Sequence, residues 1–200
     1  MTRKRKVLWT VACLVVVAVT GFSVWLRLQE DRWLAFSLHG HQHCIKATAI
    51  AFSSYAGDHG GKYPTHTNGW GDALLLLVKS NYADSSLICG PNDDGRVFRE
   101  ALEKGTDVPE ELCSRVYVQG LSKDKANGVL ILFDRVSFPG GDHFYGLKEP
   151  IREGLEGDGS TSQINDKLWL RYSREQVTKL MELGFSREQA AGYFPDAKER

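Results

Sequence analysis

Three histidines and one cysteine lie close together early in the chain and form its clearest candidate for metal chemistry. The segment LHGHQHC supplies His39, His41, His43 and Cys44. Imidazole nitrogens and a thiolate are ligands that suit zinc or copper. On a helix only His39 and His43 share a face, because neighbours on a helix surface lie three or four residues apart. A metal site is therefore one hypothesis, which requires Gly40 to interrupt the helix, and solvated or interfacial histidines are the alternative.

The remaining cysteines suggest a disulfide. Cys13 lies in an apolar stretch, where we expect it to act as a small apolar residue. Cys44, Cys89 and Cys113 follow that stretch, and an odd number predicts one bridge and one free thiol where disulfides persist. A Cys89–Cys113 bond closes a loop of roughly 25 residues, worth about 3 kcal/mol. We predict this pair, with Cys44–Cys89 as the alternative. Without a CxxC motif, redox catalysis and a zinc ribbon lack their usual signature.

Catalytic signals are missing from the sequence. It contains no GxSxG, no HExxH, no Walker loop and no GxGxxG after a strand. His59 and His143 are candidates to assist a Cys or Ser nucleophile, but nothing in the sequence places them together. We therefore expect no enzymatic activity, no catalytic residue and no small-molecule substrate. Lys plus Arg and Asp plus Glu number 25 each, and this zero net charge gives no support for nucleic-acid binding.

An uncharged stretch near the N-terminus predicts how the protein is held. Residues 7–26 read VLWTVACLVVVAVTGFSVWL. At 1.5 Å per residue a helix of this length spans roughly the 30 Å of a bilayer's hydrocarbon core. Residues 3–6 are all basic, which predicts a cytoplasmic N-terminus at residues 1–6 and an extracytoplasmic remainder. We therefore expect a single-pass protein of the inner membrane.

A cleaved signal peptide and a buried soluble helix are the alternatives for this stretch. The apolar region of a signal peptide is shorter, about 7–15 residues, and ends in a small-x-small cleavage site. Here the run is longer and its end, residues 23–26, is bulky. Trp9 and Trp25 near its two ends also suit membrane interfaces. An uncleaved anchor is the interpretation that these features favour.

Apolar periodicity and turn residues divide the rest of the chain into helices and strands. Ile45, Ala49, Phe52 and Tyr55 recur at helical spacing, which predicts an amphipathic helix that ends at the turn 57–61. We also predict helices over 70–79 and 96–104, with Gly105 as the C-terminal cap of the second. A tail at 173–194 is expected to form two short helices, the first starting at Ser173. Strands are predicted at 115–119, 128–133, 143–147 and 167–171, with an exposed charged loop at 148–159.

Several short motifs in the middle of the chain occur together in a known family. They are CIKATAIAFSSYAGDHGGKYPT, GWGDALLLL and LICGP, followed by GVLILFD, a Gly140-Gly141 turn with His143, and Asp158-Gly159-Ser160. This arrangement, over about residues 42–165, resembles the pseudopilin-like proteins of the type II secretion and type IV pilin group. It looks closest to their uncharacterised relatives in planctomycetes and verrucomicrobia.

The resemblance implies an α+β fold, in which an N-terminal transmembrane helix continues into an amphipathic helix packed on a small antiparallel sheet. The pseudopilin-like domain would cover residues 27–171, followed by a helical tail at 172–200. It implies a structural or interaction role in an envelope or secretion-type assembly, with the membrane and other envelope proteins as partners. Most of the apolar run lies before Gly21-Phe22, whereas a prepilin cleavage site precedes the apolar run, so a permanent anchor is expected.

The resemblance also implies a second candidate metal site. Some pseudopilins bind calcium in a loop near the end of the sheet, and the matching region offers Asp142, Glu153, Glu156 and Asp158. Carboxylate oxygens are the ligands that calcium prefers. No other cofactor is expected. The alternative function, from a different class, is a periplasmic zinc- or copper-binding sensor or chaperone that uses the HGHQHC stretch.

Overall fold

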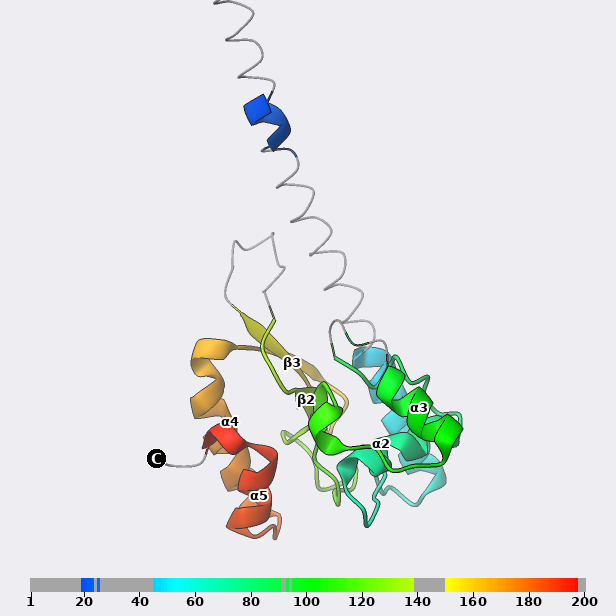
Figure 1. Ribbon diagram of the computed structural model, residues 1–200. Coiled ribbons are helices and arrows are strands. Elements are labelled where there is room, and N and C mark those ends of the chain that lie inside the picture. The colour runs from blue at the N-terminus through cyan, green and yellow to red at the C-terminus, as the bar shows by residue number, and fades with distance from the viewer. Residues whose placement is uncertain are drawn as a thin grey trace, which may run out of the picture.

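A computed structural model describes residues 19–23, 25, 45–90, 93, 95–138 and 150–197. The described chain is α+β, as expected, with a four-stranded antiparallel sheet and helices on both of its sides (Figure 1). The elements are a helix at 45–58, α2 (Trp70–Lys79), α3 (Arg96–Lys104), η1 (Glu110–Leu112), β1 (Arg115–Tyr117), β2 (Leu130–Asp134), β3 (Ile151–Glu156), β4 (Thr161–Asn165), α4 (Asp166–Glu182), α5 (Arg187–Tyr193) and η2 (Pro195–Ala197).

The predicted anchor falls mainly outside the described residues. Of residues 7–26, the structure describes only 19–23 and 25, and these are helical. No described helix combines the length and the apolar character needed to cross a membrane. The predicted strand at 143–147 also lies outside the described ranges.

The sheet is a meander in which each strand pairs with the next along the chain, in the order β1-β2-β3-β4. β1 and β2 confirm the strands predicted at 115–119 and 128–133, with shifted ends. The exposed loop predicted at 148–159 is wrong, because Ile151–Glu156 forms β3 and pairs on both sides. The strand predicted at 167–171 is also wrong, since these residues belong to α4. The tail helix therefore begins at Asp166 rather than at Ser173.

Helices cover the two faces of the sheet. On one side Phe52, from the helix at 45–58, lies 5.1 Å from the ring of Tyr117 on β1. On the other side Phe133 of β2 stacks on Phe194 at 4.7 Å and lies 5.4 Å from Trp169 of α4. Figure 1 shows α4 and α5 on the opposite side of the sheet from α2 and α3. The sheet is thus the middle layer of three.

The helix ends follow local chemistry. Gly105 adopts a left-handed conformation (φ 64°) after α3, as predicted for its cap. Asn165 caps α4 by accepting a hydrogen bond from the Lys167 backbone N–H. Ser186 and Gln189 form a reciprocal capping box at the start of α5. These caps explain why two separate helices form in the C-terminal part of the chain.

Candidate functional site

Four polar side chains cross the sheet in a row beneath the helix at 45–58. Arg115 on β1 pairs in register with Asp134 on β2, and Glu153 on β3 pairs with Gln163 on β4. The Phe133–Gly154 pairing places Asp134 beside Glu153. Alternation along the strands puts these residues on the face where Tyr117 meets Phe52. We call Arg115, Asp134, Glu153 and Gln163 the polar row.

The first two members of the polar row neutralise each other. Arg115 Nε lies 3.0 Å from Asp134 Oδ1, and the two side chains are 0% and 1% exposed. Asp134 Oδ2 accepts the backbone N–H of Glu153 at 2.8 Å. Burying two charges is costly unless they are paired and hydrogen-bonded. Here the two charges pair with each other, and the second carboxylate oxygen of Asp134 also accepts a hydrogen bond. One guanidinium nitrogen, Arg115 Nη2, has no hydrogen-bond partner.

Glu153 is the acid in the row that has no ion-pair partner among the described residues. Its side chain is buried, with only 2% of the residue exposed. Oε1 receives a long hydrogen bond of 3.4 Å from Gln163 Nε2, and Oε2 has no hydrogen-bond partner in the described part of the chain. Burial, and then repulsion from Asp134, raise the pKa of Glu153 to about 7, against the opposing effect of Arg115. The carboxyl therefore titrates near neutral pH.

A cavity of about 290 Å³ adjoins Glu153. We call it the Glu153 cavity. Its rim includes Lys46 and Gln163, which are exposed, while Ile45 on the inner side is buried. The remaining lining residues are Thr161 and Ser162 of β4. A titratable, incompletely hydrogen-bonded acid beside a cavity is a common feature of functional sites.

A second cavity, of about 270 Å³, contains two tryptophans that lie close to arginines. The Arg152 guanidinium lies 4.5 Å from the ring centre of Trp169, and Arg152 Nε is 3.2 Å from Asp166 Oδ1. Trp169 Nε1 donates to Asp196 Oδ2 at 2.8 Å. These polar groups have partners within the protein, so we interpret them as the contacts that fasten α4 and η2 to β3.

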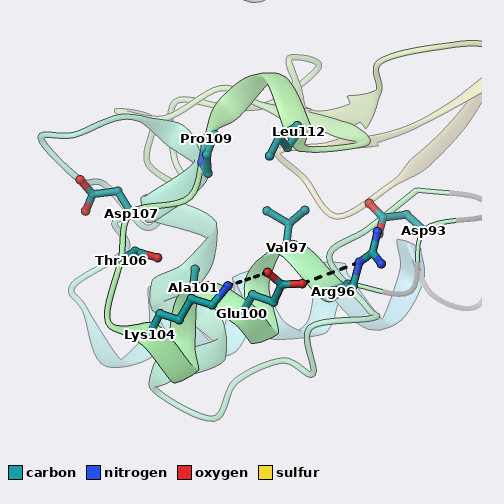
Figure 2. Close-up of a pocket in the computed structure, with 10 residues that line it drawn as sticks. All are labelled: Asp93, Arg96, Val97, Glu100, Ala101, Lys104, Thr106, Asp107, Pro109 and Leu112. Carbon is teal, nitrogen blue, oxygen red and sulfur yellow. Dashed lines mark hydrogen bonds and ion pairs between the residues drawn. The ribbon is translucent and has the colours of Figure 1, made fainter.

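An open groove of about 780 Å³ runs along α3 (Figure 2). Glu100 lies between Lys104, 2.9 Å away, and Arg96, 3.9 Å away. The hydrogen bond from Lys104 lowers the pKa of Glu100. Pro109 and Leu112 form the opposite wall, and Leu112 is 58% exposed. The groove combines charge pairs with apolar side chains, a mixture that is ordinary for a protein surface.

Most residues of the two predicted metal sites are not described by the structure. His39, His41, His43, Cys44 and Asp142 lie outside the described residues. Across the described ranges, no cluster of three or more His, Cys, Asp or Glu side chains is arranged to hold a metal ion.

The candidate calcium ligands that are described have other partners. Asp158 caps its own turn by accepting hydrogen bonds from the Ser160 N–H and hydroxyl, which lowers the pKa of its carboxyl. Glu156 contacts the Tyr172 hydroxyl at 3.4 Å on the α4 side of the sheet. Glu153 belongs to the polar row on the other side. These three carboxyls therefore do not form a common site.

Cys89 and Cys113 are both buried and both carry free thiols, so the predicted disulfide is not formed in the structure. The Cys89 thiol donates to Ser85 O at 3.1 Å, and the Cys113 thiol is 3.6 Å from Pro109 O. The two segments are nevertheless neighbours, because the Gly90 N–H donates to Ser114 Oγ at 2.8 Å. Burial raises the pKa of both thiols, that of Cys113 to about 12. The pairing stays a prediction for an oxidising compartment.

The polar row was largely missed by sequence reasoning. From the sequence, Glu153 is predicted only as a calcium ligand in an exposed loop, and Arg115, Asp134 and Gln163 are not predicted as site residues. Asp134 ends an unbroken apolar run and Arg115 begins a short apolar strand. Charges directly at the ends of buried strands were the available signal, but only the strand register shows that they meet.

Comparisons with protein-family models, with characterised proteins and with solved structures find no match for this chain. What the protein does must therefore be inferred from its own residues and their arrangement.

Proposed function

We propose that this protein is anchored in the inner membrane by its N-terminal apolar segment and presents a pseudopilin-like domain outside the cytoplasm. In this proposal the domain has a structural or interaction role in an envelope or secretion-type assembly, and it has no enzymatic activity. The proposal combines the sequence resemblance with the fold of the described residues.

The observation that carries the proposal is the packing of the helix at 45–58 on an antiparallel sheet. Ile45, Phe52 and Ala56 of this helix are buried, and Phe52 contacts Tyr63 and Tyr117. An amphipathic helix that follows an apolar segment and packs on a small antiparallel meander is the arrangement that the resemblance implies. This agreement supports a pseudopilin-like domain.

The anchor has separate support. The uncharged run at residues 7–26 is long enough for a membrane span. Its described residues are helical, and Val19, Phe22 and Trp25 are each more than half exposed. Large apolar side chains left uncovered along a helix are suited to lipid contact, because no water needs to surround them there.

The test is intact mass and membrane partition of the natively expressed full-length chain. We expect full-length mass in the membrane fraction and protease sensitivity of the domain when only the outer face of the membrane is accessible. A mature form that starts at Phe22 would instead indicate processing and filament assembly. A soluble product, or a domain protected from external protease, would overturn the anchor and its orientation.

Partner capture tests the assembly role. Chemical crosslinking in intact cells is expected to join the domain to envelope or secretion proteins, and the control is the same chain without residues 1–26. Loss of the crosslinks in this control would show that membrane placement is required. Crosslinks to cytoplasmic proteins would contradict the proposed topology.

A further inference from the structure

The Glu153 cavity has the chemistry of a binding site that the proposed function does not use. We propose that the Glu153 cavity binds an alkylammonium group, with the Glu153 carboxylate as the acceptor for its N–H donors. The inference is independent of the membrane anchor and of any secretion assembly.

The charges of the polar row leave Glu153 available for a ligand. Arg115 is within 3.0 Å of Asp134, and no base lies within ion-pair distance of Glu153 among the described residues. Its Oε2 is buried without a hydrogen-bond partner. A buried polar atom without a partner costs free energy, and an N–H donor in the cavity would remove that cost.

The number of oxygen ligands favours an ammonium group over a metal ion. Glu153 is the only carboxylate among the described lining residues, and Thr161 and Gln163 add a hydroxyl and an amide oxygen. Calcium takes six to eight oxygen ligands, whereas a primary ammonium has three donors to satisfy. Lys46 at the rim would also repel a divalent cation more strongly than a monovalent one.

The size of the cavity sets the size of the ligand. At about 290 Å³ it is much larger than the roughly 30 Å³ that one water molecule occupies in the liquid. Ile45 supplies an apolar wall suited to methylene groups. The ligand is therefore a short alkyl chain ending in an ammonium group, either a free amine or a lysine side chain of a partner.

Calorimetric titration of the full-length protein in detergent at pH 8 tests the proposal. The probes are butylammonium chloride and a short lysine peptide with blocked ends, with sodium, calcium and tetramethylammonium chlorides at equal ionic strength as references. We expect saturable binding of at least one ammonium probe. Binding should weaken as the pH falls below 7, because protonation removes the acceptor charge from Glu153.

Substitutions locate the site. Glu153→Gln is expected to weaken ammonium binding by about tenfold or more, since it removes a charge-assisted hydrogen bond. Glu156→Gln is the matched control, because Glu156 is on the same strand but contacts Tyr172 on the opposite face of the sheet. The affinity of this variant for the ammonium probes should equal that of the wild type. If Glu153→Gln does not fold, Gln163→Leu at the exposed rim is expected to weaken binding several-fold.

Each outcome has one meaning. Tighter binding of the lysine peptide than of butylammonium indicates a partner protein, and the reverse order indicates a free amine. No saturable binding of either probe, equal affinity in Glu153→Gln, or tight calcium binding in place of ammonium overturns the proposal.

Discussion

At the scale of single residues, the polar row contains two acids and one base in a region that is otherwise apolar. Arg115 and Asp134 are fully buried and compensate each other. Glu153 is next to Asp134, and the repulsion between two carboxylates opposes the ionisation of the second. Glu153 is therefore the member of the row whose protonation state changes near neutral pH, and the unfolding free energy of the domain should depend on pH through it.

The unfolding free energy is expected to fall as the pH rises through 7. The pKa of Glu153 is about 7 in the folded protein and near 4.5 in an unfolded chain, so the folded state holds the proton more tightly. The resulting stabilisation is complete below pH 4.5, declines as the pH rises from 4.5 through 7, and is absent once Glu153 is ionised in both states. A shift of this size corresponds to about 3 kcal/mol. Denaturant unfolding at a series of pH values between 5 and 8.5 measures it.

Glu153→Gln is the control for this prediction. Its side chain cannot ionise, so the difference between wild type and variant isolates the contribution of Glu153 to the pH dependence. We expect the pH dependence between 6 and 8 to be smaller in the variant. Identical pH profiles for the two proteins would show that Glu153 does not gain a proton on folding.

At the scale of elements, an aromatic cluster joins the C-terminal helices to the sheet. Phe194 follows α5 and is fully buried, and its ring is stacked on Phe133 at an interplanar angle of 11°. Trp169 of α4 contacts both rings. Gln176, also on α4, accepts the backbone N–H of Leu130 through Oε1. The tail is thus part of the domain core and not an appendage.

Phe194→Ala is expected to lower the unfolding free energy by about 3–5 kcal/mol, the usual cost of removing a buried aromatic ring. Leu168→Ala is the matched control, because Leu168 lies on α4 but is 51% exposed, and its effect should stay within about 0.5 kcal/mol. Equal effects of the two substitutions in denaturant unfolding would show that α5 is not packed on the sheet in solution.

The helices could be predicted from the sequence because their signals are local. The buried positions of α2 and the glycine after α3 are visible in short windows. β3 could not be predicted in this way. Its charged residues pair with residues of other elements, as Arg152 does with Asp166 at the start of α4. Its glycine, Gly154, packs against the Leu130 side chain, which would lie 2.4 Å from a Cβ atom at position 154.

The start of α4 was misread for a related reason. Residues 167–171 form a short apolar run between two basic residues, which suggests a strand. The buried residues of α4 are Trp169, Ser173, Gln176 and Leu180, which follow helical spacing but include two polar side chains. Gln176 is buried because it satisfies a backbone group of β2. The candidate site was hidden for the same reason, since the polar row exists only once four strands are in register.

At the scale of the whole molecule, the compartment determines the state of Cys89 and Cys113. The thiols are buried and their raised pKa values keep them protonated, so they react slowly in the folded protein. In the proposed extracytoplasmic location, a disulfide catalyst would oxidise them before folding is complete. The predicted bond would close the loop that carries α3.

Mass spectrometry of the protein isolated from membranes measures this outcome. We expect a linked pair of peptides containing Cys89 and Cys113 in non-reduced digests, and a lower melting temperature after reduction. The double variant Cys89→Ser, Cys113→Ser should melt like the reduced protein. Alkylation of both thiols in the native, non-reduced protein would contradict the predicted bond and the oxidising location.

The order of elements along the chain has a consequence for synthesis. The helix at 45–58 is synthesised before every strand that it covers. The Tyr63 hydroxyl can donate its hydrogen bond to the Gly157 carbonyl only after that residue, 94 positions later, has been added. The consecutive hairpins of the meander can close one after another, because their contacts are close in sequence. During synthesis, the apolar side of the first helix is therefore left uncovered until most of the chain has been made. The incomplete domain therefore exposes apolar surface until the last hairpin closes.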